Sequence, residues 1–113
     1  MLDIETIKNA RAMTKEYVHL AQYALDNNCS ITVTCGDEIV CKKSKDLKEI
    51  RESMECADET HAFIYNQENK RVGWAWVIPY NDDNESVADL TITDFMNNWT
   101  EEYKKFCKQL GIE

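Results

Sequence analysis

The sequence predicts an α+β domain, in which a four- to five-stranded antiparallel sheet packs with long N-terminal and C-terminal helices. Two amphipathic segments near the ends of the chain predict the helices, and four shorter segments rich in β-branched and aromatic residues predict two hairpins. Three glycines and one proline among 113 residues leave little room for linkers. We therefore expect residues 1–113 to form a single compact domain with the order α-β-β-α-β-β-(β)-α.

Residues 3–27 are predicted to form a long amphipathic helix. Asp3 is a suitable N-cap, and the pair Asn27 and Asn28 is a typical stop signal. Apolar side chains recur every three or four residues along this segment: Ile4, Ile7, Ala10, Met13, Tyr17, Leu20 or Ala21, and Ala24.

The segments 30–35 and 38–42 are expected to pair as a first hairpin around Gly36. A register with Val33 opposite Ile39 would place all of its apolar side chains on one face of the sheet. Because that register requires a loop of odd length, we expect a bulged three-residue connection rather than a tight two-residue turn.

The second hairpin is predicted from residues 60–66 and 71–79. Its expected register pairs Tyr65 with Val72, Phe63 with Trp74 and His61 with Trp76. One face then carries aromatic side chains, and the other carries small and aliphatic ones: Ala62, Ile64, Gly73, Ala75 and Val77. Two interpretations of the aromatic face remain open. It either fills the core beneath the helices or is accessible to solvent as a platform for a partner or ligand.

Three further elements complete the prediction. Ser44 is expected to cap a helix that extends to about Cys56. Residues 87–92 are expected to form a short fifth strand or an irregular return segment. Thr93 or Asp94 is expected to cap the C-terminal helix, whose apolar side chains share one face: Phe95, Trp99, Tyr103, Phe106 and Leu110.

The negative charge is concentrated in one segment. Residues 80–94 hold five carboxylates and no Lys or Arg, and thus contribute −5 to the net charge of −8. This balance argues against direct binding of nucleic acid, whose phosphates require clustered cations, and fits either a basic surface on a protein partner or simply solubility. The four carboxylates expected to pair with that surface are Asp82, Asp83, Glu85 and Asp89.

No catalytic residue, cofactor or metal site is predicted. Five cysteines lack the close pairing of a zinc site, and residues 81–86 lack the central glycine and terminal glutamate of a calcium loop. The chain has no glycine-rich phosphate loop. A cysteine nucleophile would require a basic partner, for which His61 is a better candidate than His19.

The N-terminal residues contain no apolar run of a secretory signal, and no segment reaches the length of a membrane span. An odd number of cysteines is then typical of free thiols in a reducing compartment. We expect a cytoplasmic protein that binds no membrane.

Three short strings resemble small uncharacterised accessory proteins of tailed bacteriophages: the run 72–78, the segment 87–90 and the run 93–96. The resemblance covers roughly residues 30–99. It implies a host-takeover factor, acting in the host cytoplasm, that binds and blocks host proteins. It implies no catalytic activity and assigns no functional residue.

Together these features predict a non-enzymatic acidic binding protein that inhibits or modulates a host enzyme or defence protein through a basic surface on the partner. Nucleic-acid mimicry is a weaker variant of this hypothesis. The predicted partner-binding residues are Asp82, Asp83, Glu85, Asp89, Tyr80, Trp74 and Trp76.

Two alternatives remain. The first is an intracellular small-molecule-binding domain or enzyme with an enclosed pocket lined by Phe63, Trp74 and Trp76. The second is a module that forms a homodimer through an exposed apolar stripe.

Overall fold

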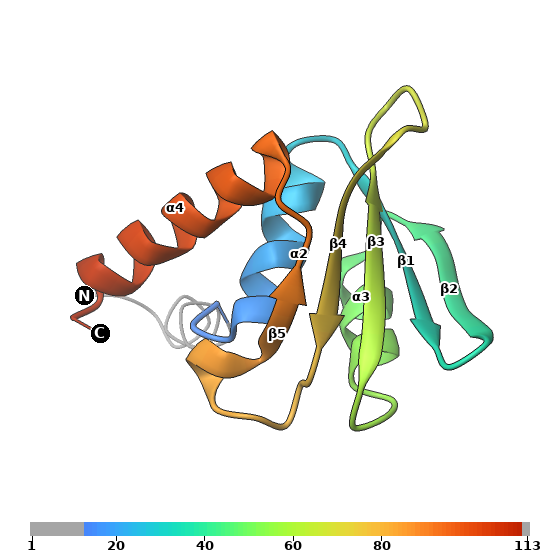
Figure 1. Ribbon diagram of the computed structural model, residues 1–113, viewed down its shortest axis with the longest axis horizontal. Coiled ribbons are helices and arrows are strands. Elements are labelled where there is room, and N and C mark those ends of the chain that lie inside the picture. Colours follow the sequence, from blue (N-terminus) through green and yellow to red (C-terminus); the bar gives the residue numbers. More distant parts are fainter. Residues whose placement is uncertain (1–12, 112–113) are drawn as a thin grey trace.

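The computed structural model describes residues 13–111, which form a five-stranded antiparallel sheet and three helices (Figure 1). The predicted α+β class is confirmed. The elements are α2 (Glu16–Asp26), β1 (Ser30–Cys35), β2 (Glu38–Ser44), α3 (Leu47–Met54), β3 (Thr60–Tyr65), β4 (Arg71–Val77), the 3-10 turn η1 (Asp83–Glu85), β5 (Val87–Leu90) and α4 (Asp94–Gln109). The part of the predicted helix 3–27 that precedes residue 13 lies outside the described residues.

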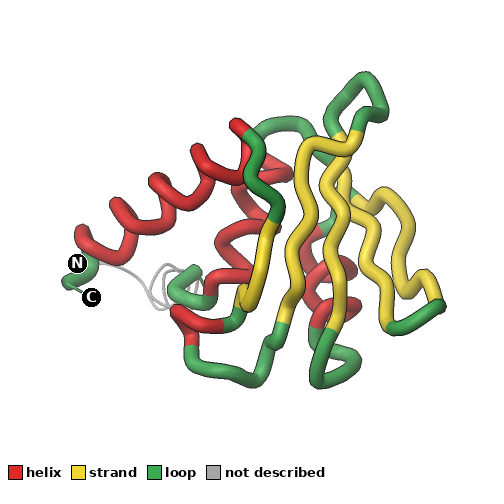
Figure 2. The backbone as a smooth tube through the Cα atoms, viewed as in Figure 1, coloured by secondary structure: helices red, strands yellow, loops and turns green. Residues whose placement is uncertain are grey.

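The strands form one layer in the order β2-β1-β3-β4-β5, and every neighbouring pair is antiparallel. Figure 2 shows the helices gathered on one side of this layer. The strands pass in front of α3 in Figure 1, and α3 contacts β1, β2 and β3 from behind. Helix α2 contacts β1, α3 and α4. The described residues therefore form two layers, a sheet and a helical cover.

The core lies between these layers because the sheet presents small and aliphatic side chains to the helices. Ala62, Ile64, Ala75 and Val77 are fully buried on the central strands. The helices contribute large buried side chains to the same core: Tyr17, Leu20, Ile50, Met54, Met96 and Trp99. Small residues on a strand allow a helix to approach closely. Large side chains of the helices can therefore pack against this face of the β3–β4 hairpin.

The aromatic side chains of β3 and β4 lie on the other face of the sheet. His61, Phe63, Tyr65, Trp74 and Trp76 are each only partly buried. The interpretation that they fill the core beneath the helices is therefore wrong. Within residues 13–111, no helix covers this face.

The predicted register of the first hairpin is also wrong. Cys35 pairs with Glu38 across a two-residue turn, in which Gly36 adopts a φ of +60°. The regular register beside this turn places Ile39 opposite Thr34, where Ile39 is 59% exposed, and shifts further along the ladder then place Cys41 opposite Val33. Bulges inside the strands, rather than a longer loop, thus reconcile the turn with a buried Cys41.

The register of the second hairpin is confirmed for Phe63 with Trp74 and for His61 with Trp76. The prediction fails nearer the loop, where a shift places Arg71 rather than Val72 opposite Tyr65. The extra residue turns the Arg71 side chain onto the aromatic face, over the ring of Phe63.

The helix ends agree in part with the prediction. Thr93 caps α4 by accepting a hydrogen bond from the backbone N–H of Met96 at 3.2 Å. Asp46, not Ser44, caps α3, because Ser44 ends β2 and its hydroxyl accepts from the backbone N–H of Asp46 instead. Leu110, expected on the buried stripe of α4, is 44% exposed just beyond the helix.

Gly73 generates a test of the packing between sheet and helices. A Cβ atom at this position would lie 2.5 Å from Met96 Sδ and 2.8 Å from Met96 Cγ, and Met96 is fully buried. We expect Gly73→Ala to lower the free energy of unfolding by about 1–3 kcal/mol in urea titrations. In a Met96→Ala background, where the clash is removed, the same substitution should cost much less. An equal cost in both backgrounds would contradict the packing described.

Candidate binding surface on the open sheet face

The uncovered side of the sheet, here called the open face, is defined by cross-strand pairs, since directly opposed residues point to the same side. Thr32 lies opposite Phe63, and Thr34 lies between Ile39 and His61. The residues on this face include Ser30, Thr32, Thr34, Ile39, Lys43, His61, Phe63, Tyr65, Arg71, Trp74, Trp76 and Asp89. Five aromatic or imidazole rings thus lie side by side on a rigid sheet.

Three of these rings form a row with nearly parallel planes. The His61 and Trp74 rings are inclined by 18° with centroids 5.7 Å apart, and the His61 and Trp76 rings are inclined by 8° at 6.5 Å. The indole N–H of Trp74 donates to Nδ1 of His61 at 3.2 Å. This bond joins those two rings edge to edge and places the proton of a neutral His61 on Nε2.

The other two rings carry cations supplied by the chain itself. Lys43 Nζ lies 5.0 Å from the ring centre of Tyr65, and the Arg71 guanidinium carbon lies 5.5 Å from that of Phe63. Lys43 also donates to the side-chain carbonyl of Asn69. One end of the open face is therefore both aromatic and cationic.

A hollow of about 380 Å³ lies at the opposite end of the open face, lined by Gly36, Glu59, His61, Trp74 and Trp76. The turn at Gly36 and the carboxylate of Glu59 thus lie beside the row of three rings. The volume is within the range of small-ligand sites. The alternative of an enclosed pocket lined by Phe63 is not matched, because this hollow is open at the surface and excludes Phe63.

The predicted partner-binding residues separate into two groups. Trp74, Trp76 and Asp89 share the open face, since Asp89 lies directly opposite Trp76. Tyr80 is 67% exposed in the loop after β4, and its hydroxyl donates to the backbone carbonyl of Glu55. The structure brings the two tryptophans together with a single carboxylate of the predicted four.

The remaining carboxylates, Asp82, Asp83 and Glu85, lie at η1, beside α2 on the helical side (Figure 1). Three hydrogen bonds fasten this loop to the start of α2, one of them from the backbone N–H of Tyr17 to Ser86 Oγ at 3.4 Å. The Thr14 hydroxyl donates to Asp83 Oδ2 at 3.1 Å, and the backbone N–H of Val87 donates to Glu16 Oε1 at 3.1 Å. The acidic loop is therefore not contiguous with the aromatic row.

Two contributors to the site were missed from the sequence, Glu59 and the pair of cations. Strand alternation could have identified Glu59, because it lies two residues before His61. The positions of Lys43 and Arg71 depend on the bulges in the two hairpins, which the assumed regular registers excluded.

Among residues 13–111, no hydrogen bond joins a histidine to a cysteine thiol. Nδ1 of His61 accepts from Trp74, and Nδ1 of His19 accepts from Trp99 at 3.0 Å. Burial lowers the pKa of His19, which favours its neutral form. The five cysteines are free thiols. Residues 13–111 contain no group of three or more His, Cys, Asp or Glu side chains that could hold a metal ion.

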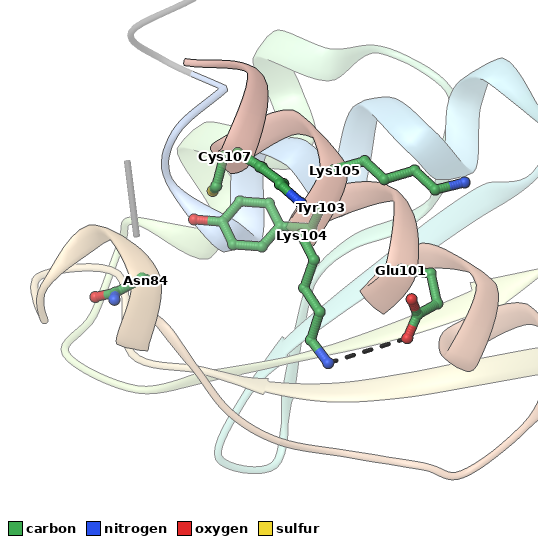
Figure 3. A pocket seen from close by; sticks show the side chains of 7 residues that line it. Asn84, Glu101, Tyr103, Lys104, Lys105 and Cys107 are labelled. Atoms are coloured by element: carbon green, nitrogen blue, oxygen red, sulfur yellow. Dashed lines mark ion pairs between the residues drawn. The ribbon is translucent and has the colours of Figure 1, made fainter. Parts of the chain in front are cut away.

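A second hollow, of about 340 Å³, lies along α4 (Figure 3). Tyr103 and Cys107 point toward the side on which Asn84 lies, while Lys104 pairs with Glu101 at 4.0 Å. Burial raises the pKa of the Tyr103 phenol, so this group is protonated at neutral pH and is not a base.

Comparisons with family models, curated proteins and solved structures found no match for this chain. None of the helices described between residues 13 and 111 is long and apolar enough to cross a lipid bilayer. The chemistry of the open face therefore carries the functional argument.

The attachment of the acidic loop generates a pH-dependent prediction. Burial raises the pKa of Glu16 from 4.5 to about 7, against the opposing effect of its backbone hydrogen bonds. As the pH rises, the carboxyl group of Glu16 loses its proton at a lower pH in the unfolded chain than in the folded one. The contribution of Glu16 to stability is therefore present below pH 4.5 and is lost as the pH rises through 7.

We therefore expect the free energy of unfolding of the wild type, relative to that of Glu16→Gln, to fall between pH 4.5 and 7. The substituted amide keeps an acceptor for the Val87 N–H but does not titrate. Urea titrations of both proteins across this range provide the measurement. A difference that is constant with pH, or that rises, would show that Glu16 is not held in a desolvated environment.

Proposed function

We propose that this chain is a non-enzymatic binding protein that docks a protein partner on its open face. The observation that carries the proposal is the partial exposure of Trp74, Trp76 and Tyr65 on a sheet face that no described helix covers. Trp, Tyr and Arg dominate the energetics of protein interfaces, and this face combines all three.

The rigidity of the surface supports the same proposal. Each ring sits on a central strand, and two hydrogen bonds fix Trp74, one from its indole to His61 and one from its backbone N–H to Thr91 Oγ1 at 3.0 Å. A partner would thus meet aromatic groups that lose little conformational entropy on binding.

We further propose that the partner presents a basic surface. The net charge of −8 and the exposed carboxylates at η1 would attract such a partner and accelerate encounter at low salt. The resemblance of residues 30–99 to phage accessory proteins extends the proposal to a host enzyme or defence protein that is inhibited or modulated by docking.

A small-molecule site is the second candidate, favoured by the volume of the hollow beside Trp76. A site for one small ligand would use only this end of the open face. Docking of a protein would use the end that carries Lys43 and Arg71 as well.

Two double variants separate the open face from the acidic loop. Trp74→Ala with Trp76→Ala removes the indole anchors, whereas Asp82→Asn with Glu85→Gln removes two exposed charges at η1. We expect the first pair of substitutions to lower the affinity for a captured partner about 30-fold or more, since truncations of hot-spot residues have effects of this size. The second pair should mainly reduce the association rate and its salt dependence.

The measurement is affinity capture from host lysate, followed by binding kinetics with the purified partner, with far-UV circular dichroism as the folding control. A partner that keeps full affinity for the tryptophan variant would overturn the assignment of the open face. Loss of binding only in the η1 variant would move the interface to the acidic loop.

A further inference from the structure

We propose that the hollow lined by Gly36, Glu59, His61, Trp74 and Trp76 is a receptor for one cationic side chain of the partner, an arginine in preference to a lysine. The inference rests on the proposed function and specifies its chemistry.

The open face already places cations on its aromatic rings. Tyr65 receives Lys43 and Phe63 receives Arg71, at 5.0 and 5.5 Å from the ring centres. Among the described residues, neither Trp74 nor Trp76 has a cation over its ring. Indole is the most attractive aromatic ring for a cation, so the two strongest acceptors on this face are those left for a partner.

The charges around the hollow match a cation. Glu59 lines it, is exposed and forms no ion pair with any residue of the described chain. Asp89 lies opposite Trp76, and Asp37 and Glu38 are exposed directly after Gly36. Between residues 13 and 111, no Lys or Arg lines the hollow.

This arrangement would repel a phosphate group. Nucleobases also stack on tryptophan, but a nucleic-acid strand needs cations along its backbone. The cations of the open face lie at its other end, where Phe63 and Tyr65 engage them. A basic side chain is therefore favoured over a base.

The ring geometry favours arginine. The planes of Trp76 and Trp74 are inclined to that of His61 by only 8° and 18°, so the three rings offer nearly parallel faces on which a planar guanidinium can stack. The N–H groups at the edge of that guanidinium remain free to donate to the Glu59 carboxylate. A lysine ammonium has no plane to stack and is more strongly hydrated.

The three tryptophans provide a direct readout. In ¹H–¹⁵N spectra each indole N–H gives one signal, which single Trp→Phe variants assign. Trp99 is 1% exposed within the core and serves as the internal reference. The first probe is a short peptide whose only charged side chain is one arginine. The others are the same peptide with citrulline or with lysine in place of the arginine, and a short oligothymidylate.

We expect the arginine peptide to shift the signals of Trp74 and Trp76 but not that of Trp99. The lysine peptide should bind more weakly, and the uncharged citrulline peptide should produce no saturable shift. Glu59→Gln should lower the affinity for the arginine peptide about fivefold, which is the effect of removing one accessible ion pair. Glu52→Gln, an identical charge change at an exposed position on α3, should have no effect.

Equal shifts with arginine and citrulline, or none with either, would overturn the inference. Saturable shifts with oligothymidylate alone would overturn it in favour of nucleic acid. The proposed function fails separately. If a captured partner depends on Trp74 and Trp76 but binds the Glu59→Gln protein with unchanged affinity, docking stands and the cationic side chain does not. If the arginine peptide binds but the affinity for the partner does not depend on the tryptophans, the site for a cationic side chain stands and docking of the partner on the open face does not.

Discussion

The alternation of side chains along β3 and β4 is the constraint on which the rest of the structure depends. Ala62, Ile64, Ala75 and Val77 point to one side and are fully buried beneath the helices, while the intervening residues carry the rings on the other side. Because successive side chains of a strand point to opposite faces, the sheet cannot bury both sets against one helical layer. The small set accommodates Met96 and the other large helical side chains, which leaves the aromatic set outside.

The open face is divided by charge along its length. Lys43 and Arg71 lie over Tyr65 and Phe63 at one end, and Glu59 and Asp89 lie near the tryptophans at the other. This polarity follows from the positions of the residues along the strands. Lys43 and Arg71 come from the bulges near the 66–70 loop, whereas Glu59 and Asp89 lie toward the opposite end of the strands. A partner would therefore bind in one orientation, because turning it around would oppose like charges.

Much of the fold could be predicted from the sequence, because its strongest signals are periodic. The alternation in β3 and β4 predicted the pairs Phe63–Trp74 and His61–Trp76, and Thr93 indicated the start of α4. The bulges at Val72 and within the first hairpin could not be predicted, since they leave one residue unpaired in return for better burial elsewhere. The site was predicted only in part, because local charge identified the acidic segment but not its attachment to α2, which depends on contacts between residues distant in the sequence. The covered face could not be chosen either, since both faces of the hairpin are hydrophobic.

The most direct test of this account is hydroxyl-radical footprinting of the three tryptophans, read by mass spectrometry at a protein concentration low enough to disfavour self-association. If the open face is uncovered in solution, Trp74 and Trp76 will be oxidised much faster than Trp99, which lies buried on α4 within the core. Protection of Trp74 and Trp76 to the level of Trp99 would contradict the account. It would mean that another part of the chain covers this face and that no partner docks there.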